Sequence, residues 1–207
     1  MEEMKEKFLS IYTGYIARPG SDKLLDWLKK SDFFTAPAST RYHLSEPGGL
    51  VKHSVHVYER LKELYKAEQL IDMKKNGDAA TSAVNAGLAD AEEETLAICG
   101  LLHDLCKVNF YVPGTRNVKN EKTGQWEKVP CYTIDDQLPY GHGEKSVYII
   151  SGFMRLSREE AMAIRWHMGA FQDGEKQNAG AAFGMYKLAV LTHLADMQAT
   201  YLDENES

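Results

Sequence analysis

An all-α fold is predicted for this chain by two features of its sequence. Apolar residues recur at helical spacing through most of the 207 residues, whereas the period-two alternation of a half-buried strand is scarce. The hydrophobic fraction of 43% is enough for one sizeable core, and the charged fraction of 26% is typical of a globular protein. We therefore expect one domain over residues 1–207, with N-terminal helices over 1–35 and a helical core over 48–202.

The N-terminal region is predicted to hold two helices. The first runs from about Glu2 to Ile16 and ends before the helix-breaking pair Pro19 and Gly20. Ser21 could then cap a short second helix.

A loop and a long helix follow. Residues 36–49 contain two prolines and two glycines, so they are predicted to form the loop. In the helix after it, Leu50, His53 and Val57 share one face by the i, i+3, i+7 rule. His53 is therefore expected to point inward.

The next helix is expected over residues 92–107, after a loop over 74–90 that is rich in small residues. Leu96 and His103 share one face of this helix, so His103 is also expected to point inward. Asp104 stands next to it, where an unpaired carboxylate would be costly to bury. A metal ion removes that cost, because it binds imidazole nitrogen and carboxylate oxygen together.

Residues 108–140 change to a pattern rich in Gly, Pro, Tyr, Thr and Val, and predict a β-hairpin insertion with its turn at 122–125. Its interleaved cations and aromatic rings could clamp a nucleotide. The alternative is an exposed hairpin with an ordinary charged surface. The residues concerned are Tyr111, Arg116, Lys119, Lys122, Trp126, Lys128 and Tyr132.

Three helices are predicted after the hairpin. The first covers about 141–154, and Ser157 opens the second as part of a capping box. The last runs over about 181–202 and places Met185 on its buried face, with Asp196 beside that face.

Composition limits the compartment and the partners. The net charge of −6 argues against long nucleic acid as a partner, because such proteins normally carry a basic face. The three cysteines show no CxxC spacing and favour a reducing, cytoplasmic setting. No apolar run approaches bilayer-spanning length, so no membrane partner is expected.

Five short motifs stand in a definite order along the chain. They are Gly48–His53, Leu101–Lys107, Gly141–His142, Trp166–His167 and Leu194–Asp196. Their order of histidine, histidine-aspartate, histidine, histidine and aspartate resembles the ligand series of the HD-domain metal-dependent phosphohydrolases. The resemblance covers residues 48–196. It implies that the chain is a single HD domain, a helical bundle with the small hairpin as an insertion.

By this resemblance, the chain binds a divalent transition metal: Mn, Fe, Ni, Co or Zn. One ion would be held by His53, His103, Asp104 and Asp196. His142 and His167 match the extra histidines of two-metal members, in which Asp104 bridges both ions. We expect two ions per chain. The alternative is one ion, with the two extra histidines donating to phosphate.

Three further residues are expected to act on the substrate. Lys107 follows the His-Asp pair by three residues, so we expect it to project from the same helix face. Its resemblance to family members with a lysine at this place suggests that it holds a phosphate oxygen; the alternative is pairing with carbonyls at a helix end.

Arg41 and His43 lie in a run similar to the approach to the first ligand in a bacterial 3′-to-5′ exoribonuclease family. We expect both to bind the substrate, and His43 could protonate a leaving group. His56 and His193 match no ligand position and are expected to be structural or solvent-facing.

These features favour a hydrolase that acts on a phosphate ester of a nucleotide or short oligonucleotide through a metal-activated water. Asp104, Lys107 and His43 are the expected catalytic residues. Two other functions fit the same residues. One is a di-iron oxygenase of the HD fold, and the other is a non-catalytic metal protein that binds a nucleotide.

Overall fold

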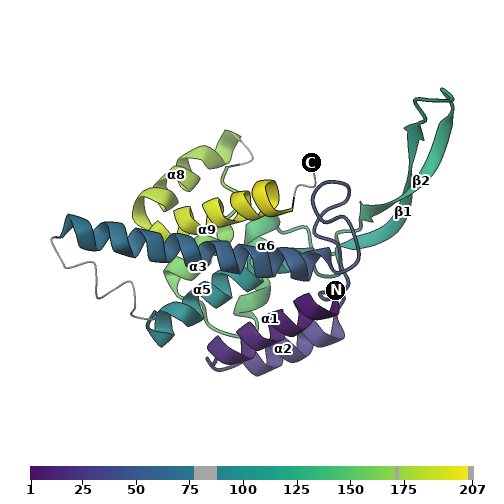
Figure 1. Cartoon of the computed structure of the whole chain (residues 1–207). Coiled ribbons are helices and arrows are strands. Elements are labelled where there is room, and N and C mark those ends of the chain that lie inside the picture. Colours follow the sequence, from purple (N-terminus) through teal and green to yellow (C-terminus); the bar gives the residue numbers. More distant parts are fainter. Residues whose placement is uncertain (77–87, 171–172, 205–207) are drawn as a thin grey trace.

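The chain forms a bundle of helices from which one β-hairpin projects (Figure 1). The computed structural model describes residues 1–76, 88–170 and 173–204. Within them the α-helices are α1 (Glu2–Tyr15), α2 (Ser21–Lys30), α3 (Gly49–Lys75), α5 (Asp90–Leu102), α6 (His142–Ser151), α7 (Arg158–Arg165), α8 (Lys176–Met185) and α9 (Lys187–Gln198). Shorter elements are the 3₁₀ turns η1 (Leu105–Lys107) and η2 (Asp173–Glu175), the π-helical turn η3 (Ala199–Asp203), and the strands β1 (Tyr111–Lys119) and β2 (Trp126–Ile134). The prediction of an all-α fold with a small hairpin insertion is confirmed.

Helix α3 is the centre of the bundle. It packs against α1, α5 and α9, and in Figure 1 it runs between α5 and α9. Its predicted inward stripe is confirmed, since Leu50, Val57 and Leu61 have no exposed surface and His53 is 1% exposed. The helix begins after Gly48, whose φ of 81° lies in the left-handed region that favours glycine. The apolar stripe therefore carries His53 into the interior.

Ion pairs of Arg18 with Glu94 and Glu160 join the segment between α1 and α2 to α5 and α7. Arg18, in the break after α1, donates to Glu160 from Nη1 at 2.8 Å and Nη2 at 2.9 Å. Glu160 also completes the predicted capping box of α7, where Ser157 accepts from its backbone N–H at 3.2 Å. The prediction that Ser21 caps α2 is wrong, because Gly20 occupies that position with a φ of 94°.

The predicted helix over 92–107 ends earlier than expected. Helix α5 stops at Leu102, and His103 and Asp104 form a turn that leads into η1. The backbone N–H of Cys106 donates to Ser146 Oγ at 3.0 Å, outside the helical ladder. Contacts with α6 therefore end the helix before the ligand pair. The middle of the loop predicted over 74–90 lies outside the described residues.

The predicted helix over 181–202 is two helices and a π-helical turn. Its chain breaks at Tyr186, whose φ of −128° and ψ of 104° are extended. This break changes the helical phase, so Met185 is 68% exposed and its predicted place on the buried face is wrong. Thr192 and Ala195 are buried as expected.

The hairpin lies within the predicted segment 108–140. Its strands pair antiparallel from Tyr111 with Ile134 to Lys119 with Trp126, and the turn lies between them at 120–125. The hairpin extends away from the helices (Figure 1). The side chain of Trp126 on β2 is 70% exposed.

The close approach of α3 and α5 gives a test of the packing. A Cβ added at Gly100 would lie 2.5 Å from Tyr58 Cα. Gly100→Ala is therefore expected to lower the free energy of unfolding by about 1–3 kcal/mol, measured by urea denaturation. Gly180→Ala in α8 is the control, because its Cβ meets nothing within 4 Å and should stabilise by about 0.5–1 kcal/mol. Equal midpoints for the Gly100 variant and the wild type would contradict the packing of these helices.

Candidate metal centre

Six side chains predicted as metal ligands come together from separate parts of the bundle. They are His53 within α3, His103 and Asp104 in the turn after α5, His142 at the first residue of α6, His167 just after α7, and Asp196 within α9. Five of these side chains are at most 9% exposed, and His142 is the exception at 38%. His142 is therefore the most solvent-exposed side chain of the six.

The carboxylate of Asp104 is the centre of the cluster. Its Oδ2 lies 3.4 Å from His103 Nε2 and 3.6 Å from His53 Nε2. Its Oδ1 lies 3.0 Å from His142 Nε2 and 3.5 Å from His167 Nε2. Each carboxylate oxygen thus faces one pair of imidazoles.

Asp196 completes the first of these two groups. Its Oδ1 lies 3.2 Å from His53 Nε2. Burial alone would raise the pKa of Asp196, but the hydrogen bond and charge of His53 lower it well below the ordinary value. The cluster therefore offers two anionic carboxylates to four imidazoles.

The outer nitrogens of two histidines fix the orientation of their rings. His103 Nδ1 donates to the carbonyl of Gly100 at 2.8 Å, and His167 Nδ1 donates to the carbonyl of Ile164 at 2.7 Å. Both carbonyls belong to the last turn of a helix, where they have no intrahelical partner. With the proton on Nδ1, each neutral ring presents the Nε2 lone pair to the cluster.

The inner nitrogens of the four rings approach one another in two pairs. His103 Nε2 is 3.3 Å from His53 Nε2, and His167 Nε2 is 3.2 Å from His142 Nε2. Converging lone pairs repel one another unless a cation lies between them. Imidazole and carboxylate are also the donors that transition metals prefer. The residues present therefore fit a divalent metal. Among the candidate ligand groups of the described residues, His103 with Asp104 and His167, and Asp104 with Cys106 and His142, share Asp104.

Lys107 contacts the cluster, but it does not lie on the helix face predicted from the sequence. It lies in η1 rather than on the helix face of His103, yet its Nζ is 2.7 Å from Asp104 Oδ2. Burial would lower the pKa of Lys107, but Asp104 raises it above the ordinary value. Asp104 in turn has its pKa held well below normal, because Lys107 and His103 outweigh the effect of burial. A cation therefore stands beside the cluster at neutral pH.

His43 and Arg41 differ in their distance from the cluster. The ring centroid of His43 is 5.0 Å from that of His53, and His43 Nε2 is buried without a hydrogen-bond partner. Burial lowers the pKa of His43 to about 4, and the neighbouring charges of His53 and Lys107 act in the same direction. Arg41 is exposed and packs over the ring of Tyr42, with its Nη2 donating to the phenol oxygen at 3.0 Å. His43 thus stands at the cluster, whereas Arg41 lies beside the neighbouring Tyr42.

A pocket of about 540 Å³ opens onto the cluster. It is lined by Tyr42, His43, His53, Lys107, Met168, His193, Asp196, Met197, Thr200 and Tyr201. His193 bonds the carbonyl of His167 through Nδ1 at 2.6 Å and stacks on Phe183, which fits its expected structural role. The pocket brings apolar and aromatic side chains to the same place as the metal-ligand residues.

Two polar residues at the cluster were missed from the sequence. Cys106 Sγ lies 3.3 Å from His142 Nδ1, and burial raises the pKa of this thiol. Glu204 bonds His53 Nδ1 at 3.0 Å and His56 Nδ1 at 2.9 Å, so His56 faces a carboxylate and is not free in solvent. Burial opposes ionisation of Glu204, but these two histidines lower its pKa to about 2. Cys106 lies within the Leu101–Lys107 motif, whereas no sequence signal marked Glu204.

The comparisons with known proteins place the chain in a family. The family model described as the HD domain matches residues 50–197. The match spans more than half of the chain, so the chain belongs to the HD domain family. Comparisons with the curated proteins and with the solved structures gave no match.

A membrane-spanning helix is not found in the described part of the chain. None of its helices is both long enough and apolar enough to cross a bilayer.

Proposed function

We propose that the chain is a metal-dependent phosphohydrolase that cleaves a phosphate ester of a nucleotide or short oligonucleotide. Membership of the HD domain family supports the general class of metal-dependent hydrolases. The observation that carries the proposal further is the carboxylate of Asp104, each oxygen of which faces its own pair of imidazoles. This arrangement fits two divalent ions that share one carboxylate.

His53, His103, Asp104 and Asp196 would hold one ion, and Asp104, His142 and His167 would hold the other. Bound metal supplies a Lewis acid for the phosphoryl oxygen and an acidified water for attack on phosphorus. The chain's own groups then orient the ester. Lys107 is placed to bind a phosphoryl oxygen, because its buried ammonium lines the pocket beside Asp104.

The pocket supports a small substrate with an apolar body. Tyr42, Tyr201, Met168 and Met197 give flat and apolar walls that suit a nucleobase. Lys107 is the single lysine among the lining residues of the described chain, and no arginine stands with it. One phosphoryl group is therefore matched better than a triphosphate. The net charge of −6 likewise disfavours a long nucleic acid.

His43 contributes through a hydrogen bond in this proposal. Its pKa is lowered to about 4, so the ring is neutral at pH 7. A neutral imidazole keeps one N–H, which can donate a hydrogen bond to a substrate oxygen, but it lacks the second proton that a general acid would transfer. Arg41 is proposed to act on the substrate side of Tyr42, where it packs.

Metal analysis and a substrate screen test the proposed function together. The purified protein should contain a divalent transition metal and should release phosphate or a nucleotide from mono- or diesters when Mn, Ni, Co, Fe or Mg is added back. His103→Ala and Asp104→Ala should lose metal and nearly all turnover but keep the helical circular dichroism. Full metal content in both variants would overturn the ligand assignment. Iron-dependent oxidation without ester cleavage would favour the oxygenase instead.

The number of ions is tested by His142 and His167, the two histidines that face Asp104 Oδ1. His142→Ala or His167→Ala should lower the metal content from about two ions to about one per chain, since both rings face Asp104 Oδ1. The measurement is elemental analysis after equilibrium dialysis. An unchanged content with slower turnover would make the two residues phosphate donors at a one-metal site.

The role of Lys107 is tested by kinetics. If its ammonium binds an oxygen that gains charge in the transition state, Lys107→Ala should lower kcat/KM by roughly 100-fold and leave the metal content unchanged. Lys52→Ala is the control, because Lys52 is a half-exposed lysine on α3 that pairs with Glu46 at 3.9 Å. A wild-type kcat/KM in the Lys107 variant would remove it from the active site.

A further inference from the structure

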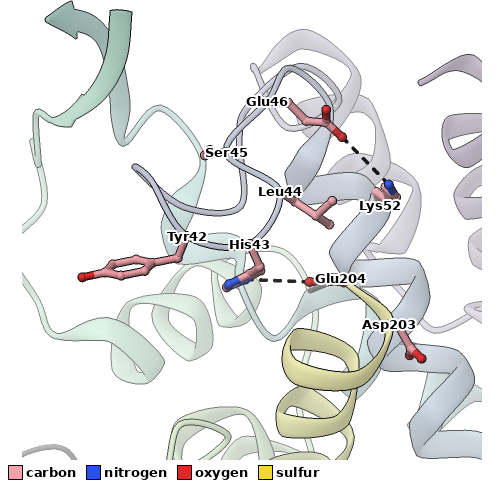
Figure 2. A pocket seen from close by; sticks show the side chains of 8 residues that line it. All are labelled: Tyr42, His43, Leu44, Ser45, Glu46, Lys52, Asp203 and Glu204. Carbon is pink, nitrogen blue, oxygen red and sulfur yellow. Dashed lines mark ion pairs between the residues drawn. The ribbon is translucent and has the colours of Figure 1, made fainter. Parts of the chain in front are cut away.

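Glu204 is a buried acid that the proposed mechanism does not use. It lies seven positions beyond the segment matched by the HD domain family, and its side chain has no exposed surface. Both of its carboxylate oxygens contact His53 Nδ1, at 3.0 and 3.1 Å, and one of them contacts His56 Nδ1 at 2.9 Å. Figure 2 shows that Glu204 also faces His43, whose Nε2 lies 3.9 Å away.

The end of α9 is shaped so that Glu204 reaches α3. Helix α9 continues into the π-helical turn Ala199–Asp203, and the backbone N–H of Glu204 closes this turn by donating to the carbonyl of Ala199 at 3.1 Å. The next anchor is Asp203, which accepts from Arg60 Nε at 2.7 Å. Arg60, His56 and His53 lie on the same helix. Asp203 and Glu204 therefore both bind side chains of α3. Asp203 pairs with a guanidinium, whereas Glu204 contacts two imidazoles.

The contact with His53 differs from the contacts of two other histidines in the cluster. His103 and His167 donate their Nδ1 protons to neutral backbone carbonyls. His53 instead has a full carboxylate on Nδ1, while its Nε2 faces Asp196 and Asp104. A carboxylate on the outer nitrogen orients a ligating ring and makes its inner nitrogen a stronger donor.

We infer that Glu204 is a positioning residue that aims His53 Nε2 at the metal and strengthens its bond to the ion. This rests on the proposed metal site. Glu204 touches neither substrate nor metal in this role, and His56 serves as a second donor that keeps the carboxylate in place. The effect is confined to the ion that His53 holds, because the ring pair of His142 and His167 lies across Asp104 from it.

Metal affinity is the measurement that tests this inference. Glu204→Ala should weaken the binding of one ion by about 10–100-fold in a chelator competition with Mn or Co, while the affinity for the other ion stays as in the wild type. Glu204→Gln keeps an oxygen that can accept from His53 Nδ1 but loses the charge. Its affinity for that ion should therefore lie between those of the wild type and Glu204→Ala. Both variants should still reach the wild-type metal content when metal is in excess.

Asp203→Asn is the matched control. It removes the neighbouring acid and its ion pair with Arg60 but leaves the contact with His53, so it should change the melting temperature without changing either metal affinity. If Glu204→Ala fails to fold, the near-isosteric Glu204→Gln carries the test. Wild-type affinities in folded Glu204→Gln and Glu204→Ala would overturn the inference. A metal content one ion per chain lower than that of the wild type at saturating metal would also overturn the inference, because Glu204 would then be a ligand.

The outcome for His103→Ala separates the two proposals. If that variant loses metal and the Glu204 variants keep the wild-type metal affinities, the metal site stands and only the positioning role fails. If His103→Ala keeps its metal, the proposed site itself fails.

Discussion

The buried carboxylate of Asp104 is the constraint on which the rest of the site depends. An uncompensated carboxylate that is 2% exposed would destabilise the fold by several kcal/mol. Imidazoles from four different parts of the chain face its two oxygens, and Lys107 Nζ contacts Oδ2 at 2.7 Å. Because the imidazoles come from separate helices, they meet at Asp104 only when α3, α5, α6 and α7 pack in one arrangement. The same arrangement brings the Nε2 atoms of the four imidazoles together in a geometry that suits a metal ion.

Helix ends do much of the positioning. His103 and His167 each lie just after a helix, three residues beyond a carbonyl that the helix leaves unpaired. That carbonyl accepts the Nδ1 proton and turns Nε2 inward. Ending α5 at Leu102 therefore satisfies a backbone acceptor and directs His103 Nε2 into the cluster at the same time. A helix continued to Lys107 would have used this carbonyl in its own ladder.

The site draws on segments at both ends of the matched family region. The loop over 36–47 delivers His43, and the turn after α9 delivers Glu204; these two residues face each other (Figure 2). Both also lie beside His53. Arg18 joins the N-terminal helices to the first turn of α7 through Glu160. The parts outside residues 50–197 thus contribute contacts both to the cluster and to the helices around it.

The sequence by itself determined the helical class, the inward face of α3 and the hairpin, because apolar periodicity and turn residues are local signals. The ordered motifs also identified His53, His103, Asp104, His142, His167 and Asp196 as one set before any fold was known. Only the tertiary structure decided the break at Tyr186, the end of α5 and the placement of Lys107 in a 3₁₀ turn. Glu204 could not be found from sequence either, since its role arises from contacts with residues about 150 positions away. Such contacts depend on how helices pack, and local propensity does not encode them.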